Sequence, residues 1–241
     1  LIALYIAYHY ARKKVRVSSF VLVAMLIPLW PGTTPPASGI FGTPIADNET
    51  ALEQFYKTEA ARSVQFVAPG KQDIPFDIIF LNICSLSWDD LDFVAERDKP
   101  LFQRFDIIFT RFNTAASYSG PSIIRLMRGS CGQQQHGRLY DPVNPQCQTF
   151  AALQQIGFDP QLAMNHDGQY GKLLQDIRER GGLRAPPFNA DALSPYLTSF
   201  DGTPVAGDLA VLSQWWEHRQ TLSAQRVALY YNSISLHDGN R

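Results

Sequence analysis

The chain has 241 residues, of which 45% are hydrophobic and 18% are charged. This composition is typical of a folded protein, and the length allows one α/β domain with a sizeable core. The formal net charge is −1, and the few basic clusters are short and are not interleaved with aromatic residues. These features argue against a nucleic-acid-binding protein.

The first 30 residues have the pattern of the end of a transmembrane region. Residues 1–8 (LIALYIAY) and 17–30 (VSSFVLVAMLIPLW) are apolar, and residues 11–16 (ARKKVR) between them carry four positive charges. Short basic loops lie on the cytoplasmic side of membranes, so everything after Pro31 is expected on the far side. The second segment is shorter than the roughly 20 residues of an ordinary span. A signal peptide and a buried helix therefore remain as alternatives.

Residues 31–45 form a linker rich in Pro, Gly and Thr, and residues 46–241 are expected to form the exported domain. The chain begins inside an apolar run and stops at Arg241, directly after a strand-like segment. We therefore expect a fragment at both ends, with the C-terminal part of the domain missing.

Three apolar runs predict buried strands of a parallel sheet, at residues 76–83 (FDIIFLNI), 105–110 (FDIIFT) and 227–236 (VALYYNSISL). Helical patterns occupy the chain around and between these runs, at residues 48–60, 121–128, 150–156, 173–180 and 209–221. Such alternation predicts an α/β fold, a mostly parallel sheet sandwiched by helices.

The chain contains three cysteines. Cys131 and Cys147 bracket a polar loop, which in an exported domain is a natural place for a disulfide. Cys84 is left over, either as a buried small side chain or as a functional thiolate. Its position at the end of the first predicted strand is where open α/β sheets bind ligands.

The segment 117–121 (SYSGP) follows the second predicted strand and opens a helix. Proline is favoured in the first helical turn. Ser119 would lie beside free N–H groups and the positive end of the helix dipole, which stabilise an alkoxide or a phosphate oxygen. Alternatively, Ser119 is only a helix cap.

These motifs together resemble the phosphoethanolamine transferases of bacterial cellulose biosynthesis (BcsG type), which belong to the alkaline-phosphatase superfamily. The matching segments are 82–88 (NICSLSW), 117–120 (SYSG), 165–168 (NHDG) and 235–239 (SLHDG). The resemblance implies an alkaline-phosphatase or sulfatase-like fold behind a transmembrane anchor. The catalytic domain would lie in the periplasm, held at the inner membrane.

The resemblance also implies roles for individual residues. Cys84 and Ser119 would bind Zn²⁺, with Ser119 as the nucleophile, and His237 would meet the phosphoryl group. Tyr118 is a candidate for orienting the substrate, and His166 either lines the phosphoryl site or is a simple loop histidine. Zinc accepts thiolate, imidazole and oxygen ligands, which suits this set.

The implied reaction moves phosphoethanolamine from phosphatidylethanolamine to Ser119 and then to a glucose 6-hydroxyl of cellulose, next to the cellulose synthase complex. Members of the family carry two further zinc ligands, a Glu-His pair, beyond the last motif matched in this chain. We therefore expect the fragment to bind zinc weakly and to be inactive by itself.

Two alternatives remain open. The first is another enzyme of the superfamily, such as a phosphoethanolamine transferase for lipid A, a membrane-anchored sulfatase or a phosphatase. A sulfatase would need an arginine two residues after the proline, and Ser119-Gly120-Pro121-Ser122-Ile123 lacks it. The second is a non-catalytic scaffold subunit of a polysaccharide synthase.

Overall fold

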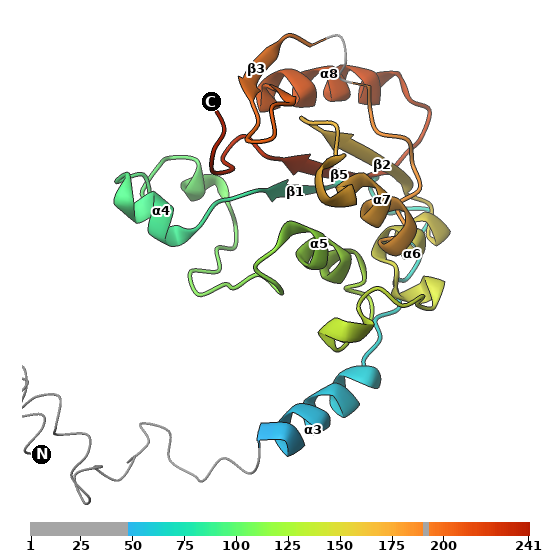
Figure 1. The fold of residues 1–241 in the computed structure, drawn as a ribbon. Coiled ribbons are helices and arrows are strands. Elements are labelled where there is room, and N and C mark those ends of the chain that lie inside the picture. The colour runs from blue at the N-terminus through green and yellow to red at the C-terminus, as the bar shows by residue number, and fades with distance from the viewer. Residues whose placement is uncertain (1–47, 190–192) are drawn as a thin grey trace, which may run out of the picture. The chain divides into compact units, whose positions relative to one another are not determined.

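The computed structural model describes residues 48–189 and 193–241, which from Glu49 onward belong to one compact unit (Figure 1). The strands are β1 (Ile78–Ile83), β2 (Asp159–Met164), β3 (Pro195–Thr198), β4 (Pro204–Ala206) and β5 (Val227–Ser233). The α-helices are α3 (Asn48–Ala60), α4 (Trp88–Phe93), α5 (Ser119–Met127), α6 (Thr149–Gln155), α7 (Leu173–Gln175) and α8 (Asp208–Thr221). A π-helix (Asp176–Arg180) continues α7.

The predicted membrane segments (1–30) and linker (31–45) lie outside the described residues. Within the part of the chain that the structure describes, no helix combines the length and apolar character needed to cross a bilayer.

The main sheet is parallel and has the strand order β1-β5-β2. All seven residues of the central strand β5 are buried, because it has a neighbour on each edge and helices on each face. The sequence predicted β1 and β5 but missed β2, whose proline and polar residues hide the strand pattern. It also missed the small antiparallel hairpin of β3 and β4.

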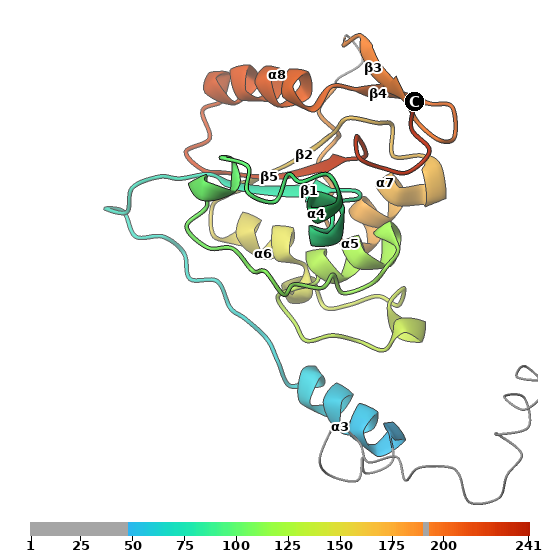
Figure 2. The ribbon, with the colours of Figure 1, turned by 90° about the vertical axis from the view of Figure 1, so that its left-hand side faces the viewer.

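Helices cover both faces of this sheet, as Figure 2 shows with α8 on one side and α5 and α6 on the other. One core cluster joins Ile123 and Met127 of α5 and Phe150 of α6 to Tyr230 of β5. The other joins Val211 and Trp215 of α8 to the opposite face of the sheet. The predicted α/β class with a mostly parallel sheet between helices is therefore confirmed.

The predicted strand at residues 105–110 is wrong. The segment is extended but pairs with no described strand, and Phe105, Ile107 and Phe109 are exposed. Its apolar run satisfies the sequence pattern of a strand, but a strand also needs a partner for its backbone groups. The backbone carbonyl of Phe109 instead accepts a hydrogen bond from the indole of Trp88 at 3.2 Å.

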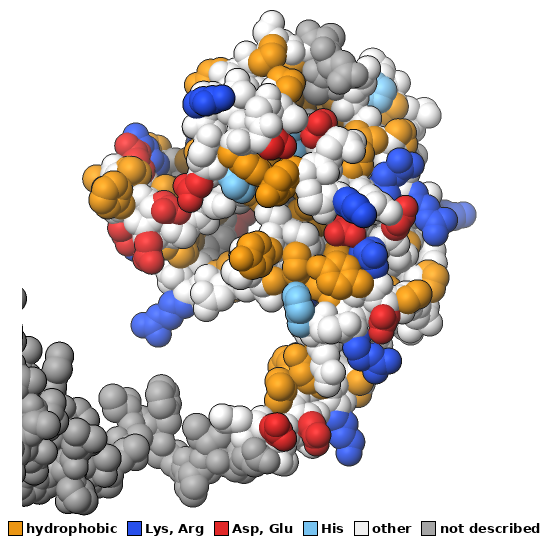
Figure 3. Space-filling view, viewed as in Figure 1, with side chains coloured by type: hydrophobic (Ala, Val, Ile, Leu, Met, Phe, Trp, Pro, Cys, Tyr) orange, Lys and Arg blue, Asp and Glu red, His pale blue; other side chains and the backbone are white. Residues whose placement is uncertain are grey.

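Strand β1 was expected to be buried on both faces, and this is also wrong. Its residues alternate between half-buried and exposed, with Ile79, Leu81 and Ile83 on the exposed side. The cause is its place at the edge of the described sheet. Hydrophobic side chains are also visible at the surface around α4 and α5 in Figure 3.

The predicted disulfide between Cys131 and Cys147 is present. Next to it, the side chain of Arg128 is buried. Its guanidinium donates to the carbonyl oxygens of Arg180 and Leu139, at 3.0 and 2.6 Å. The arginine therefore ties the end of α5 to the loop that the disulfide closes.

Helix α3 is attached to this loop through a buried carboxylate. Glu59 is 5% exposed, accepts a hydrogen bond from the backbone N–H of Gln133 at 2.7 Å and pairs with Arg62. Gly132 lies so close to the end of the helix that an added Cβ would be 1.9 Å from the carbonyl oxygen of Glu59. The close approach of the two backbones therefore requires glycine at this position.

At the amino ends of the main-sheet strands, Asp77 precedes β1 and forms a two-pronged ion pair with Arg219 of α8, at 2.8 and 3.0 Å. It also accepts the backbone N–H of Val227 at 2.8 Å, where β5 begins. Burial by itself raises the pKa of Asp77, but the hydrogen bonds from Arg219 and Val227 outweigh it, so the pKa lies below its ordinary value. This carboxylate fixes the amino ends of β1 and β5 relative to α8.

Candidate active site at the carboxyl ends of the parallel strands

Three neighbouring strands end at the same edge of the main sheet, and each places a chemically capable side chain there. Cys84 directly follows β1, and its N–H donates to the carbonyl oxygen of Ser233 in β5 at 2.8 Å. Asn232 lies near the end of β5, in register with Met164, the last residue of β2. His166 follows two residues later. Open α/β sheets bind their ligands at this edge.

Ser119 approaches Cys84 from the helical layer below the sheet. It is the first residue of α5, and its Oγ lies 3.7 Å from the Sγ of Cys84. Tyr118 is the cap residue of the helix, and no side-chain hydrogen bond caps this end. Ser119 is therefore not the cap that the alternative interpretation proposed, because its hydroxyl points to the sulfur and not back to the helix backbone.

The sulfur of Cys84 is also faced by two amides. The Nδ2 of Asn82 lies 3.4 Å and the Nδ2 of Asn232 lies 3.8 Å from Sγ. Together with the hydroxyl of Ser119, three donors surround one acceptor. Donors of this kind typically orient a sulfur whose lone pairs serve a ligand or a metal.

Below this group lies the hydroxyl of Tyr230, which is fully buried and completes no hydrogen bond with any described residue. It approaches the side chain of Asn232. Burial, followed by the electrostatic effect of Cys84, raises the pKa of Tyr230, while the neighbouring Asn232 side chain acts in the opposite direction. A buried hydroxyl without a partner costs free energy.

His166 joins the same network from β2. Its Nδ1 accepts the backbone N–H of Gly168 at 3.1 Å, which leaves the proton of the neutral ring on Nε2. Nε2 then donates to Oδ1 of Asn232 at 2.7 Å. Burial lowers the pKa of His166, against the opposing effects of Asn232 and of nearby carboxylates. The ring is thus neutral near pH 7 and held in one orientation.

His237 lies in the loop after β5 and is half-buried, and no hydrogen bond or ring contact among the described residues joins it to Cys84 or Ser119. Its ring stacks on Phe200, with centroids 4.5 Å apart, and its Nδ1 lies 2.8 Å from the carbonyl oxygen of Asp238. The loop is fixed by Asn240, whose side chain donates to the carbonyl oxygen of Ile234. Tyr118 is 78% exposed at the mouth of the site.

Sequence reasoning missed the buried polar residues that support this edge. Asn165 is 2% exposed and donates to Asp208 and Ser235, while its Oδ1 accepts the N–H of Ile234. Asp208 also accepts the hydroxyl of Tyr231 at 2.6 Å. The sequence did offer a signal for Asn232, because a polar residue at the end of a predicted buried strand is placed where open α/β sheets bind ligands.

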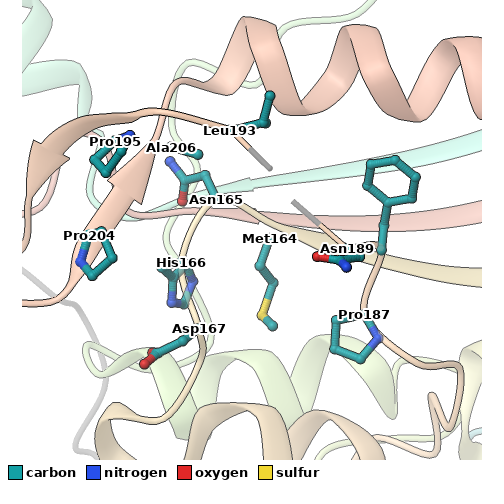
Figure 4. A pocket seen from close by; sticks show the side chains of 11 residues that line it. Met164, Asn165, His166, Asp167, Pro187, Asn189, Leu193, Pro195, Pro204 and Ala206 are labelled. Atoms are coloured by element: carbon teal, nitrogen blue, oxygen red, sulfur yellow. The ribbon is translucent and has the colours of Figure 1, made fainter. Parts of the chain in front are cut away.

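A cavity of about 500 Å³ opens beside His166 (Figure 4). The picture shows it between the β3–β4 hairpin, with Pro195, Pro204 and Ala206, and Pro187 on the other side. Neither Cys84 nor Ser119 lines it. The cavity therefore adjoins the site at His166 only.

The residues present fit part of a zinc site. In a tetrahedral site, bonds of about 2.3 Å to sulfur and about 2.0 Å to oxygen place the two ligand atoms about 3.5 Å apart. The observed separation of Cys84 Sγ and Ser119 Oγ is 3.7 Å. Over residues 48–189 and 193–241, no cluster of three or more His, Cys, Asp or Glu side chains is placed to hold a metal ion.

The fold and this edge define a class of α/β protein with a polar, sulfur-containing site at the carboxyl ends of a parallel sheet. Comparison with known proteins narrows the class. Residues 41–241 match the family described as "Cellulose biosynthesis protein BcsG C-terminal domain". The chain belongs to this family of cellulose biosynthesis proteins.

Two curated relatives agree with the family match. The chain is 43% identical over 190 residues to the cellulose biosynthesis protein BcsG of Salmonella typhimurium (strain LT2) and to that of Escherichia coli (strain K12). Each match covers 78% of this chain and 34% of the relative. The chain thus spans about a third of the length of the curated relatives it matches.

Proposed function

We propose that the full-length protein is a zinc-dependent transferase that moves phosphoethanolamine from phosphatidylethanolamine to cellulose. The observation that carries the proposal is the approach of the Ser119 hydroxyl to the Cys84 sulfur, 3.7 Å apart. Membership in a family of cellulose biosynthesis proteins supports cellulose as the acceptor and the cellulose synthase complex as a partner.

In the first half-reaction, Ser119 Oγ attacks the phosphorus of the lipid headgroup. The bond from phosphorus to the diacylglycerol oxygen breaks, and diacylglycerol leaves with the proton of the Ser119 hydroxyl. In the second, a glucose 6-hydroxyl attacks the same phosphorus, the bond to Ser119 Oγ breaks, and the proton of the glucose hydroxyl passes to Ser119 Oγ. A covalent intermediate divides one difficult transfer into two easier ones.

The chain's own residues favour these steps. No side-chain hydrogen bond caps the start of α5, and the positive end of the helix dipole there stabilises phosphate oxygens beside Ser119. The amides of Asn82 and Asn232 hold the sulfur of Cys84 in place. Tyr118, exposed next to Ser119, is available to orient the headgroup. His237 is proposed to meet the phosphoryl group.

Cys84 and Ser119 are the residues of this chain that would hold Zn²⁺, and the bound ion would activate the serine hydroxyl and neutralise charge on the phosphoryl group. With two ligands from the described site, the 241-residue chain is expected to hold zinc only weakly. We also propose a periplasmic position for this domain, at the inner membrane, because its donor is a bilayer lipid. Anchoring would present that donor at high effective concentration.

Mass spectrometry of the zinc-loaded full-length protein, incubated with phosphatidylethanolamine, tests the proposal. We expect a phosphoethanolamine adduct on the peptide that contains Ser119, absent in Ser119→Ala and retained in Ser117→Ala, two residues away. An adduct that water removes, with release of phosphoethanolamine even when cellulose is present, would instead favour a hydrolase of the same superfamily. No adduct in any form would favour a scaffold subunit.

A further inference from the structure

The side chain of Asn232 connects two functional side chains that come from different strands. It belongs to the central strand β5 and is completely buried. Its Oδ1 lies 2.7 Å from His166 Nε2, on the β2 side, and its Nδ2 lies 3.8 Å from Cys84 Sγ, on the β1 side. One amide thus faces both neighbours, with its acceptor toward the histidine and its donor toward the sulfur.

The direction of each hydrogen bond follows from the partners. The N–H of Gly168 occupies Nδ1 of His166, so Nε2 must be the donor of the neutral ring. Asn232 Oδ1 accepts that proton, which turns Nδ2 toward the sulfur. The result is a continuous chain of donors from Gly168 through His166 and Asn232 to Cys84. In such a chain each hydrogen bond polarises its neighbours, and this strengthens them.

Asn232 is 0% exposed, so water does not replace its amide, whereas Cys84 and His166 are half-buried. The buried hydroxyl of Tyr230 lies beside the amide. Loss of the amide would leave the Nε2 proton of His166 without its acceptor, and the sulfur without one of its donors. Asn82 provides a contrast, because it donates to the same sulfur at 3.4 Å, but no hydrogen bond among the described residues joins it to His166.

We propose that Asn232 is a positioning residue. It sets both the orientation of the Cys84 sulfur and the choice of the His166 ring nitrogen that carries the proton, so that a change at one of these side chains alters the other. This inference rests on the proposed function only in treating Cys84 and His166 as parts of one site. Its test needs neither zinc nor turnover, so its failure is distinguishable from failure of the transferase proposal.

The test is nitrogen NMR of the His166 ring in the 241-residue chain. In the parent protein we expect the signals of a neutral ring protonated on Nε2. Cys84→Ala should shift these signals, because it removes the sulfur at the other end of Asn232. In Asn232→Leu the same Cys84→Ala change should leave the ring signals unmoved. In Asn82→Leu, the matched control, the shift should persist.

If Asn232→Leu does not fold, Asn232→Ser replaces it, because the shorter side chain adds no charge and cannot reach both neighbours at once. The response of the His166 ring to Cys84→Ala should then be lost as well. A ring that does not respond to Cys84→Ala in the parent protein would overturn the proposal. A response that survives in Asn232→Ser would also overturn it.

Discussion

The Oγ of Ser119 and the Sγ of Cys84 lie 3.7 Å apart, although 35 positions separate them in the sequence. The contact exists because β1 ends where α5 begins, at the carboxyl edge of the parallel sheet. This spacing is that of a hydroxyl donating a hydrogen bond to sulfur, and it is also compatible with the two zinc ligands of the proposed function.

The first prediction concerns this pair. In the full-length protein, Cys84→Ala should weaken zinc binding at least about tenfold, since a change even in residues behind the ligands costs about 10–100-fold. Competition with a coloured chelator measures the affinity. Ser85→Ala, the exposed neighbour, serves as the control and should bind zinc as the parent does. Equal affinity of the Cys84 and Ser85 variants would remove Cys84 from the metal site.

A second prediction concerns the attachment of α3. Gly132→Ala would place a methyl group 1.9 Å from the carbonyl oxygen of Glu59. Since backbone on both sides must shift, we expect the free energy of unfolding to fall by about 2 kcal/mol. Amide hydrogen exchange should speed up in α3 first. Gly137→Ala is the matched control, because nothing lies within 4 Å of its added Cβ. Similar losses in both variants would contradict this account.

Much of the local structure was predictable because it depends on short-range signals. The helix at Asn48–Ala60, the helix that begins at Ser119 and the strand at Val227–Ser233 all follow from capping and apolar patterns. The pairing of Cys131 with Cys147 followed from the loop that they bracket. The strand pattern placed only Cys84 at the end of a strand, and the family resemblance grouped it with Ser119 and, as one of two alternatives, with His166.

The remaining features depend on tertiary context. Residues 105–110 have the sequence pattern of a strand, but no described strand pairs with them. The reverse holds for β2, which pairs with β5 although its sequence pattern is a poor match to a strand. Asn232 was missed as a site residue because an asparagine at the end of an apolar run does not by itself indicate which side chains it faces. Only the register of β5 against β1 and β2 shows that it faces both Cys84 and His166.

A third prediction concerns the ion pair at the amino end of the sheet. Asp77→Asn should lower the free energy of unfolding by about 2 kcal/mol at neutral pH, the usual range for hydrogen bonds to charged groups. The exposed Asp106→Asn is the control and should change little. Chemical denaturation measures both variants.

The pH dependence of this effect has a definite sign. The pKa of Asp77 is lowered in the folded protein. Its contribution is therefore complete above the unfolded pKa of about 3.9 and is lost as the pH falls through the lower folded pKa. The difference between the parent and Asp77→Asn should accordingly shrink in acid. A difference that stays constant from pH 7 to strong acid would show that the charge of Asp77 is not the cause.

The last prediction concerns His166, whose pKa is lowered chiefly by burial. Because the folded ring binds its proton less readily than the unfolded chain does, stability falls as the pH drops below about 6.5 and through the folded pKa. His166→Gln keeps a polar side chain but cannot titrate, so its unfolding free energy should decline less over this range. Urea denaturation at several pH values measures the slope. The exposed His136→Gln should keep the parent slope, and an unchanged slope in His166→Gln would mean that this ring does not link folding to protons.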